Sequence, residues 1–425
     1  MSIRSQLVQV AVSLADRLGS ERALDAQKII DAACRRAGHA DFGQDDHGAP
    51  WQIEAPLRRL LAAFDEEAHL SPFGRLAARW DMGRLLQNVL LLRSKERERP
   101  AVLDEAITAP VFITGMPRSG TSFLHALLAQ DPTHRAPRCW QTIHPYPGHS
   151  YPGPDGIDAA IRNVERQLRL FDQLAPGMHD VHPTAARDPQ ECGEINAHVL
   201  QSLRFDTTHH VPSYRRWLDR VGHAQAYRFH RRFLQHLQHQ DAAPARRDGQ
   251  AARARWVLKS PDHVLALDAL RAAYPDAQIV MLHRDPVHVL ASVARLTELV
   301  RMPFAREIDR VQIGRQVSDD WAVGAARMMR AADSGGVVHL HYRGLVADPL
   351  GAVRQLYAGL LDRALPAEAE ARMRALLERR PRGGYGRNSY SLADFGLDAD
   401  TQRARFAAYA ERFGVERGSQ HEAAA

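Results

Sequence analysis

The most constraining segment of the chain runs from Val111 to Leu128 and reads VFITGMPRSGTSFLHALL. A short apolar run, a turn bounded by Gly115 and Gly120, and the start of a helical pattern follow one another there. A strand, a glycine turn and a helix N-terminus place backbone N–H groups around a phosphate-like anion. The segment therefore predicts an anion-binding loop in an α/β fold.

This loop differs in one position from the phosphate-binding loop of nucleotide hydrolases. Gly115, Gly120 and Ser122 stand where that motif has its glycines and its hydroxyl, but Thr121 stands where it requires lysine. We therefore do not expect an ATPase. Arg118 lies inside the loop, and its planar guanidinium with five N–H donors suits an anion that carries several oxygens.

Further along the chain, short apolar runs alternate with helical patterns. Strands are predicted at residues 255–259, 278–283 and 337–342, and helices at 262–273, 286–300 and 309–332. This alternation indicates a parallel sheet flanked by helices on both faces, with the phosphate-loop strand among its members. Ligands of such sheets bind beyond the carboxyl ends of the strands, where Gly115, Lys259, Arg284 and Tyr342 fall.

The chain divides into a helical N-terminal region and one α/β domain. Residues 1–105 show helical spacing, with Ser71-Pro72 as a helix start, and we expect them to pack on the core. The α/β domain is predicted at 106–417, with a helical insertion at about 154–250 and a frayed tail at 418–425. Within the insertion we expect helices at 157–174, 189–202 and 224–240, followed by a polar linker at 241–253.

Composition favours a cytoplasmic enzyme. The 425 residues are 45% hydrophobic, enough for one large core, and no apolar run is long enough to cross a bilayer. Three cysteines at wide spacing argue against a disulfide framework. The net charge of +6 comes from arginines spread along the chain, so we expect no nucleic-acid partner. The histidines show no zinc-type spacing, and we expect no metal.

Four segments resemble sulfotransferases that use 3'-phosphoadenosine 5'-phosphosulfate (PAPS), in particular their larger bacterial branch. Residues 117–122 match the family segment P-R/K-S-G-T-T/S. The strand at 279–283 ends in Arg284, with Ser292 eight residues on, as in the family. Residues 256–263 (WVLKSPDH) and 390–396 (YSLADFG) are also similar. The resemblance covers roughly Pro110 to Leu397.

This resemblance implies transfer of a sulfuryl group from PAPS to a hydroxyl or amine of a small or lipid-like acceptor, without a metal. Arg118 and Lys259 would act on the transferred group and the leaving oxygen. The donor's 5'-phosphosulfate would be held by Arg118, Ser119, Gly120, Thr121 and Ser122. Its 3'-phosphate would be held by Arg284, Ser292 and a basic loop containing Arg382, Gly383 and Gly384.

The general base is left open. Relatives carry a histidine two residues after the lysine, but Pro261 stands there, and His263 is the nearest histidine. After the strand, loop and helix that carry the anion-binding segment, the bacterial branch often shows Trp-Glu, where this chain has Trp140-Gln141. Glu191 and His263 are weighted equally as the base, ahead of His182 and Glu194. We expect Glu191 and Glu194 to share a helical face, one of them with a raised pKa.

Two other functions remain open. One is a magnesium-dependent kinase for a nucleotide or small molecule that keeps the loop geometry. The other is a protein that binds adenosine bisphosphate without turnover, for which Gln141 is the only support. Neither the acceptor nor the oligomeric state can be read from the sequence.

Overall fold

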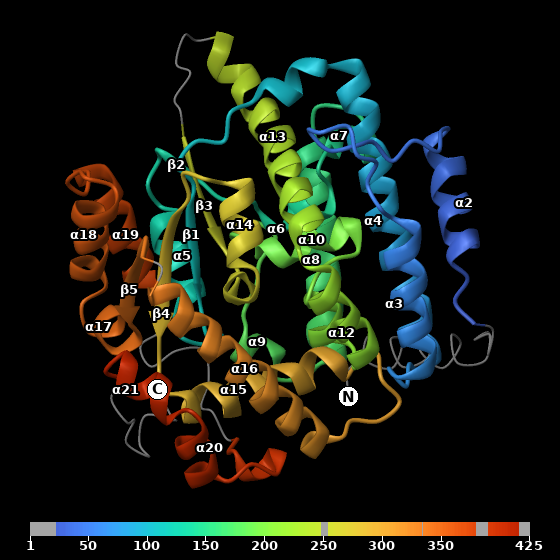
Figure 1. Ribbon diagram of the computed structural model, residues 1–425. Helices are drawn as coiled ribbons and strands as arrows, with labels where there is room; N and C mark the ends of the chain where they lie inside the picture. The colour runs from blue at the N-terminus through green and yellow to red at the C-terminus, as the bar shows by residue number, and fades with distance from the viewer. Residues whose placement is uncertain (1–22, 248–253, 334, 380–389, 416–425) are drawn as a thin grey trace.

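The computed structural model describes residues 23–247, 254–333, 335–379 and 390–415. It is built around a five-stranded sheet whose neighbouring strands all run parallel, as the sequence predicts (Figure 1). The strand order is β2-β3-β1-β4-β5, so β1 is central. The strands are β1 (Val111–Gly115), β2 (His134–Arg135), β3 (Arg255–Lys259), β4 (Gln278–His283) and β5 (Val337–His341).

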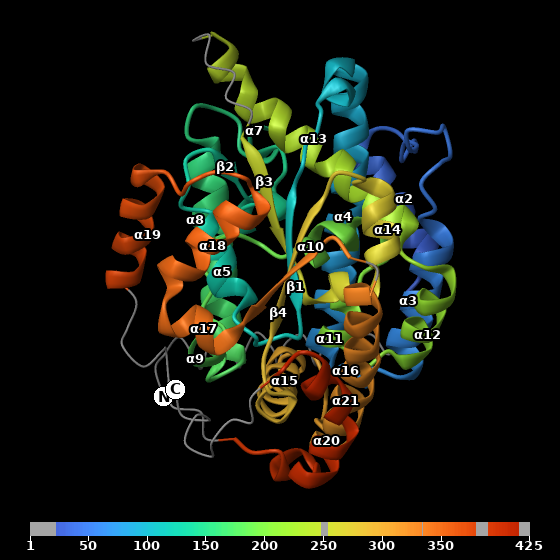
Figure 2. The same ribbon diagram turned by 60° about the vertical axis from the view of Figure 1, so that its left-hand side comes forward.

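Both faces of the sheet are buried, because successive strand residues point to opposite sides. Val111 and Ile113 join one hydrophobic cluster, and Phe112 between them joins the other. The smaller cluster holds the helices on one face (Figure 2): α5 (Thr121–Leu128), α17 (Tyr342–Ala347), α18 (Pro349–Leu360) and α19 (Ala367–Arg379). The register sets Gly115 opposite Leu282 and Ile113 opposite Lys259, so the carboxyl ends of the strands meet at one edge.

The larger cluster joins the sheet to the N-terminal helices, so that one core runs through both. These helices are α2 (Ala26–Ala37), α3 (Glu54–Glu66) and α4 (Pro72–Glu98), followed by the 3₁₀ helix η1 (Pro100–Asp104). The predicted helix start is confirmed: the Ser71 hydroxyl accepts a hydrogen bond from the Gly74 N–H at 3.0 Å, and Pro72 takes the first turn.

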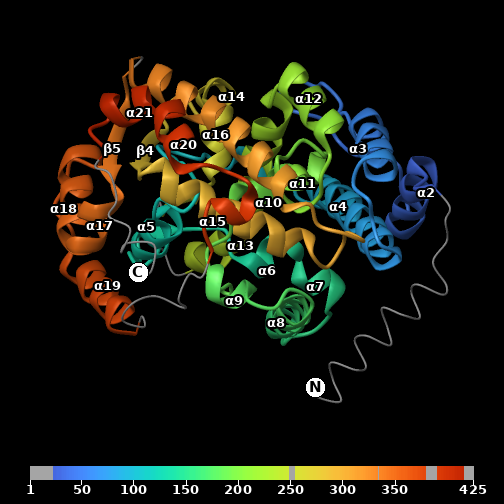
Figure 3. The same cartoon turned by 90° about the horizontal axis from the view of Figure 1, so that it is seen from below.

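The segment between β2 and β3 is helical, and α6 to α9 gather on one side of the molecule (Figure 3). Its elements are α6 (Cys139–Ile143), α7 (Pro147–Ser150), α8 (Gly156–Leu174), α9 (Met178–Val181), α10 (Cys192–Asn196), η2 (Ala197–Val199), α11 (Arg204–Thr208), α12 (Pro212–Val221) and α13 (Ala224–Arg247). Two expectations were wrong. The helix expected at 189–202 is reduced to α10 and η2, and α13 continues to Arg247 where a linker was expected, because alanine and arginine favour helix.

The remaining helices cover the second face and the lower end of the sheet. They are η3 (Pro261–Leu265), α14 (Leu267–Ala273), α15 (Pro286–Arg301), α16 (Arg310–Asp333), η4 (Ala393–Phe395), α20 (Ala399–Arg405) and α21 (Ala407–Arg412). The single helix expected at 262–273 was wrong, because Ala266 at φ −143° separates η3 from α14. Within the described ranges, no helix is long and apolar enough to span a bilayer.

Candidate functional site

The loop after β1 has a backbone path that two glycines make possible. Gly115 has φ 133°, and a Cβ there would lie 2.3 Å from the carbonyl oxygen of Leu282 on β4. Gly120 caps α5 at φ 91°, and a Cβ there would meet the Tyr342 ring at 3.1 Å. A larger residue at either position would push the loop away from the sheet, so both glycines are required by geometry.

Arg118 lies at the tip of this loop in a left-handed conformation, φ 61°, which is costly for a residue other than glycine. Its carbonyl accepts a hydrogen bond from the Arg284 guanidinium at 2.7 Å, and its own Nε donates to the Ser292 hydroxyl at 3.1 Å. Burial and the nearby charge of Arg284 lower the pKa of Arg118. Among the described residues no carboxylate forms an ion pair with Arg118. Two adjacent cations of this kind form an anion site.

Of the other loop residues, Ser119 and Thr121 are buried, whereas Ser122 is exposed. The buried Ser119 hydroxyl donates to the Met116 carbonyl at 2.6 Å, which closes the turn. Thr121 is buried at the start of α5, whereas Ser122 is exposed and its hydroxyl accepts a hydrogen bond from Lys259 at 3.0 Å. The N–H groups of Thr121 and Ser122 open α5 and have no carbonyl partner within the helix, so they can bind an anion.

Lys259 is the charged centre of the site. It ends β3, and its side chain is only 3% exposed. Besides Ser122, its ammonium group pairs with the carboxylate of Glu191, which lies at the N-cap of α10 and is 35% exposed. Burial alone would raise the pKa of Glu191, but the charge and the hydrogen bond of Lys259, together with nearby His182 and His125, outweigh burial and hold that pKa below its usual value.

The arrangement of Glu191 and Glu194 was predicted wrongly. Glu191 is extended, with ψ 144°, because α10 begins only at Cys192, so the two carboxylates do not share a helical face. Glu194 instead pairs with Arg84 of α4 at 2.6 Å and with Arg204 at 3.3 Å. The raised pKa expected for one of the two is not found at Glu191, where the shift is downward.

The structure separates the two histidine candidates. The His263 ring is fully buried, packs edge-on against Phe112 at 5.0 Å and bonds to the Tyr227 hydroxyl at 2.5 Å through Nδ1. Burial lowers its pKa well below the usual value. For His182, burial, reinforced by the charge of Lys259 and opposed by that of Glu191, lowers the pKa to about 4. His263 is therefore placed in the core and not beside Glu191.

Two tyrosines contact the predicted donor residues: Tyr342, which was predicted only to lie at the ligand-binding edge of the sheet, and Tyr390, which was given no role in the site. The Arg284 guanidinium lies 4.0 Å from the centre of the Tyr342 ring, and the Tyr390 hydroxyl donates to Ser292 at 2.9 Å. Tyr342 follows β5, which made it a strand-end residue, and Tyr390 opens the C-terminal segment that carries the resemblance. Arg382, Gly383 and Gly384 lie outside the described residues.

Gln141 has a structural contact. Its side-chain oxygen accepts a hydrogen bond from the backbone N–H of Arg138 at 2.9 Å, which closes the first turn of α6. This role accounts for a glutamine at that position without reference to catalysis.

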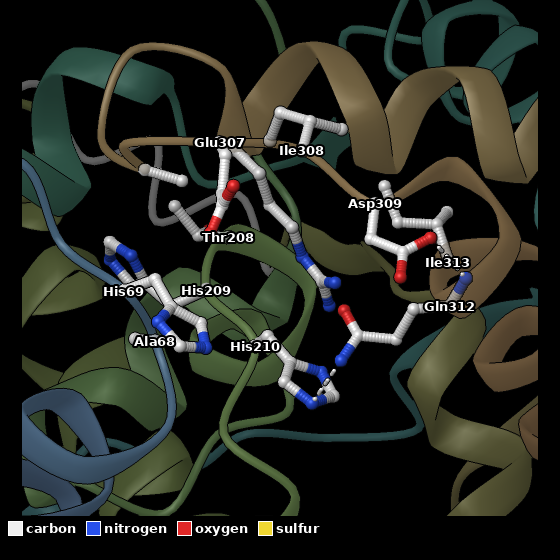
Figure 4. A pocket seen from close by; sticks show the side chains of 12 residues that line it. Ala68, His69, Thr208, His209, His210, Glu307, Ile308, Asp309, Gln312 and Ile313 are labelled. Atoms are coloured by element: carbon white, nitrogen blue, oxygen red, sulfur yellow. Dashed lines mark hydrogen bonds between the residues drawn. The ribbon is translucent and has the colours of Figure 1, made fainter.

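A separate cavity of about 290 Å³ lies away from these residues, between the turn after α3, the turn after α11 and the linker from α15 to α16 (Figure 4). Its lining includes His69, His209, His210 and Arg301, and the Gln312 side chain bonds to His210 at 2.8 Å. It contains none of the predicted site residues. Within the described part of the chain, no cluster of three or more histidine, cysteine or acidic residues could hold a metal ion.

Comparisons with known proteins agree on one family. The model described as "Sulfotransferase family" matches residues 110–361. Omega-hydroxy-beta-dihydromenaquinone-9 sulfotransferase Stf3 from Mycobacterium bovis and from Mycobacterium tuberculosis is 24% identical over 263 residues. That match spans 59% of this chain and 62% of the relatives' length.

Two crystal structures are similar over nearly the whole chain. Sulfotransferase STF1 from Mycobacterium tuberculosis is 32% identical, with a TM-score of 0.75, over 92% of this chain and 100% of that one. Sulfotransferase STF9 from Mycobacterium avium is 26% identical, with a TM-score of 0.78, over 93% of this chain and 98% of that one. The predicted α/β fold is confirmed by this likeness.

Proposed function

The chain belongs to the sulfotransferase family, and we propose that it transfers a sulfuryl group from PAPS to a hydroxyl or amine of a small or lipid-like acceptor. The observation that carries this proposal is the position of Lys259. Its ammonium group touches both Ser122 on the anion loop and the carboxylate of Glu191. A cation, an anion loop and a carboxylate that can take a proton are the three groups that such a transfer requires.

The donor fits the cationic side of this site. Arg118 and the N–H groups of Thr121 and Ser122 would hold the 5'-phosphosulfate, and Arg284 and Ser292 the 3'-phosphate. The donor supplies the sulfuryl group and leaves as adenosine 3',5'-bisphosphate. Lys259 and Arg118 stabilise the charge that develops on the leaving phosphate oxygen, in a site where burial strengthens electrostatic interactions.

Glu191 serves as the base that takes the acceptor's proton. Its carboxylate is partly exposed, whereas His263 is enclosed in the core. Without donor, Lys259 holds the pKa of Glu191 low, which makes it a weak base. When Lys259 turns to an incoming anion, the pKa of Glu191 rises and the carboxylate becomes a better proton acceptor.

An apolar acceptor agrees with exposed apolar side chains on α4 and α8. Leu76 and Trp80 of α4 are more than half exposed, and Leu170 of α8 is 41% exposed. Phe304 stacks with Phe73 of α4 and lies 6.1 Å from Phe171 of α8, so the two helices share an aromatic contact. The matched relative Stf3 is named for a hydroxylated menaquinone, which is a lipid of this chemical type.

The donor proposal is tested by calorimetric titration. We expect adenosine 3',5'-bisphosphate to bind without a metal ion, and Arg118→Ala to weaken binding at least about tenfold, because it removes a charge-assisted contact. Binding of ATP only, and only with magnesium, would overturn the proposal in favour of a kinase. The Arg75→Ala variant, which changes an ion pair remote from the loop, is the matched control.

Turnover is then measured with labelled PAPS and a panel of hydroxylated isoprenoids, short alcohols and amines. Label should appear on a hydroxylated acceptor, and Trp80→Ala should raise the KM of long apolar acceptors more than that of short ones. If the protein binds the bisphosphate but transfers label to none of these classes, the acceptor part of the proposal is wrong.

A further inference from the structure

The Ser292 hydroxyl receives two hydrogen bonds inside the donor site. Arg118 Nε donates to it at 3.1 Å and the Tyr390 hydroxyl donates at 2.9 Å. A serine hydroxyl has two acceptor lone pairs and one proton, so both lone pairs are occupied. Ser292 is 6% exposed, and within the described residues no protein group accepts its proton. A buried donor in this state requires an acceptor from outside the described residues, and a bound nucleotide would supply one.

A second tyrosine, Tyr409 of α21, contacts the residue that precedes Arg284 in the chain. Its hydroxyl forms a hydrogen bond with His283 Nδ1 at 2.9 Å. Tyr409 is 1% exposed, and its ring packs against Phe413 and the His283 ring. These contacts hold the turn between β4 and α15 from the side of α21 (Figure 2).

The Arg284 side chain is oriented by two contacts, one with the Tyr342 ring and one with the Arg118 carbonyl. Its guanidinium lies on the Tyr342 ring at 4.0 Å, and one of its N–H groups donates to the Arg118 carbonyl at 2.7 Å. The remaining N–H groups of its fork are left for an anion. The free Ser292 proton lies on α15, which Tyr390 contacts. The free Arg284 donors follow His283, which Tyr409 contacts.

We propose that the segment from Tyr390 to Tyr409 contributes to donor binding. In this proposal Tyr390 orients the Ser292 hydroxyl so that its proton is donated to the 3'-phosphate of the nucleotide. Tyr390 is thus a positioning residue that determines specificity for 3'-phosphorylated adenosine nucleotides. Tyr409 supports the same recognition through His283, which immediately precedes Arg284. This inference rests on the proposed function, because it takes the 3'-phosphate as the ligand of Arg284 and Ser292.

The test compares two nucleotides that differ only in the 3'-phosphate. Calorimetry gives the Kd of adenosine 3',5'-bisphosphate and of adenosine 5'-monophosphate for each variant. We expect Tyr390→Phe to weaken bisphosphate binding about three- to tenfold and to leave monophosphate binding unchanged, because one oriented hydrogen bond is lost. Ser292→Ala should have at least the same effect, and the double variant should show little further loss, because the two residues act through one contact.

A matched control removes a tyrosine hydroxyl elsewhere. Tyr357 is fully buried on the opposite face of the sheet, where its hydroxyl donates to Asp131 at 2.6 Å. Tyr357→Phe should lower the thermal midpoint without changing the ratio of the two Kd values. If Tyr390→Phe fails to fold, Tyr409→Phe provides the second variant, with a smaller loss of the same ratio expected.

Each result has a defined meaning. If the wild type binds both nucleotides equally, the donor assignment under the proposed function is wrong. If the wild type prefers the bisphosphate and neither tyrosine variant changes that preference, the donor assignment stands and the role of the C-terminal segment is wrong. Equal losses for both nucleotides would also overturn the inference, since they would indicate a structural effect on the whole site.

Discussion

Glu191 and Glu194 lie three residues apart, yet the structure gives them opposite surroundings. Glu194 is 12% exposed and is held by two guanidinium groups, at 2.6 Å from Arg84 and 3.3 Å from Arg204. Glu191 is 35% exposed and has one lysine, which it shares with the loop hydroxyl of Ser122. Two arginine forks fix a carboxylate in place, whereas a single shared ammonium group can be taken by another anion.

The charges around the two sites support this difference. Burial disfavours the charged form of Arg84, but Asp81 and Glu194 outweigh it and raise its pKa above the usual value. That cluster is internally neutralised. At the donor site Arg118, Arg284 and Lys259 face only Glu191 among the described acidic residues that form ion pairs, so positive charge is in excess. One region therefore stabilises the fold, and the other is arranged to accept an anion.

The largest effect is expected for Glu191→Gln. Because glutamine cannot take a proton, kcat should fall by about 10²–10⁴, while the fold and bisphosphate binding persist. Steady-state kinetics with labelled donor, and a thermal melt, measure both. A kcat near that of the wild type would remove Glu191 as the base and return attention to His182.

The next effect is expected for Lys259→Met, which keeps most of the side-chain length but removes the charge. Turnover should fall by about 10²–10³, because the leaving oxygen loses its preorganised cation. Lys28→Met is the matched control, since that lysine is exposed and forms only a surface pair with Asp25. Comparable turnover in the two variants would contradict the role of Lys259.

Glu194→Gln should show the converse result. Breaking a largely buried contact with two arginines should lower the free energy of unfolding by roughly 2 kcal/mol. The kcat of the folded fraction should stay near that of the wild type. Urea denaturation and active-site-normalised kinetics test this. A loss of kcat without a loss of stability would contradict the assignment of Glu194 to fold stability and not to catalysis.

A smaller signal is expected when the nucleotide binds. Lys259 holds the pKa of Glu191 below its usual value, so a ligand that draws Lys259 away should raise that pKa. At a pH of about 5 the carboxylate should then take up a fraction of a proton. Calorimetry in buffers of different ionisation enthalpy counts this proton. Glu191→Gln should remove this proton uptake. If the wild type and the variant take up the same number of protons, Glu191 is not coupled to nucleotide binding through Lys259.

The last prediction concerns the pH dependence of stability and not turnover, at Asp262, a third carboxyl group near this site. Burial and then the charge of Glu191 raise its pKa to about 7. A raised pKa in the folded state means that stability is lost as the pH rises from near the unfolded value of 3.8 toward 7. Relative to the wild type, Asp262→Asn should therefore become more stable over that interval by a few kcal/mol, since one pKa unit corresponds to about 1.4 kcal/mol. Thermal melts of the two proteins at a series of pH values measure this. A difference in stability between the variant and the wild type that does not change with pH would contradict the prediction.

Much of the sheet could be predicted from the sequence. The strands at 255–259 and 278–283 have the predicted bounds, because short apolar runs between helical patterns have few other structures available. The edge strand β2 was missed, since two residues give no pattern. The start of the helix expected at 189–202 was placed too early, because Glu191 is extended and its side chain pairs with Lys259, a residue far away in the chain.

What the sequence determined by itself is the set of residues at the carboxyl ends of the strands. Parallel strands bring their ends to one edge, so Gly115, Lys259, Arg284 and Tyr342 had to meet there once the strands were recognised. Only the tertiary structure decided which distant side chains join them. Glu191 and Lys259 are 68 positions apart, and Ser292 and Tyr390 are 98 apart. Such contacts depend on how helices pack across the sheet, which no local pattern in the chain encodes.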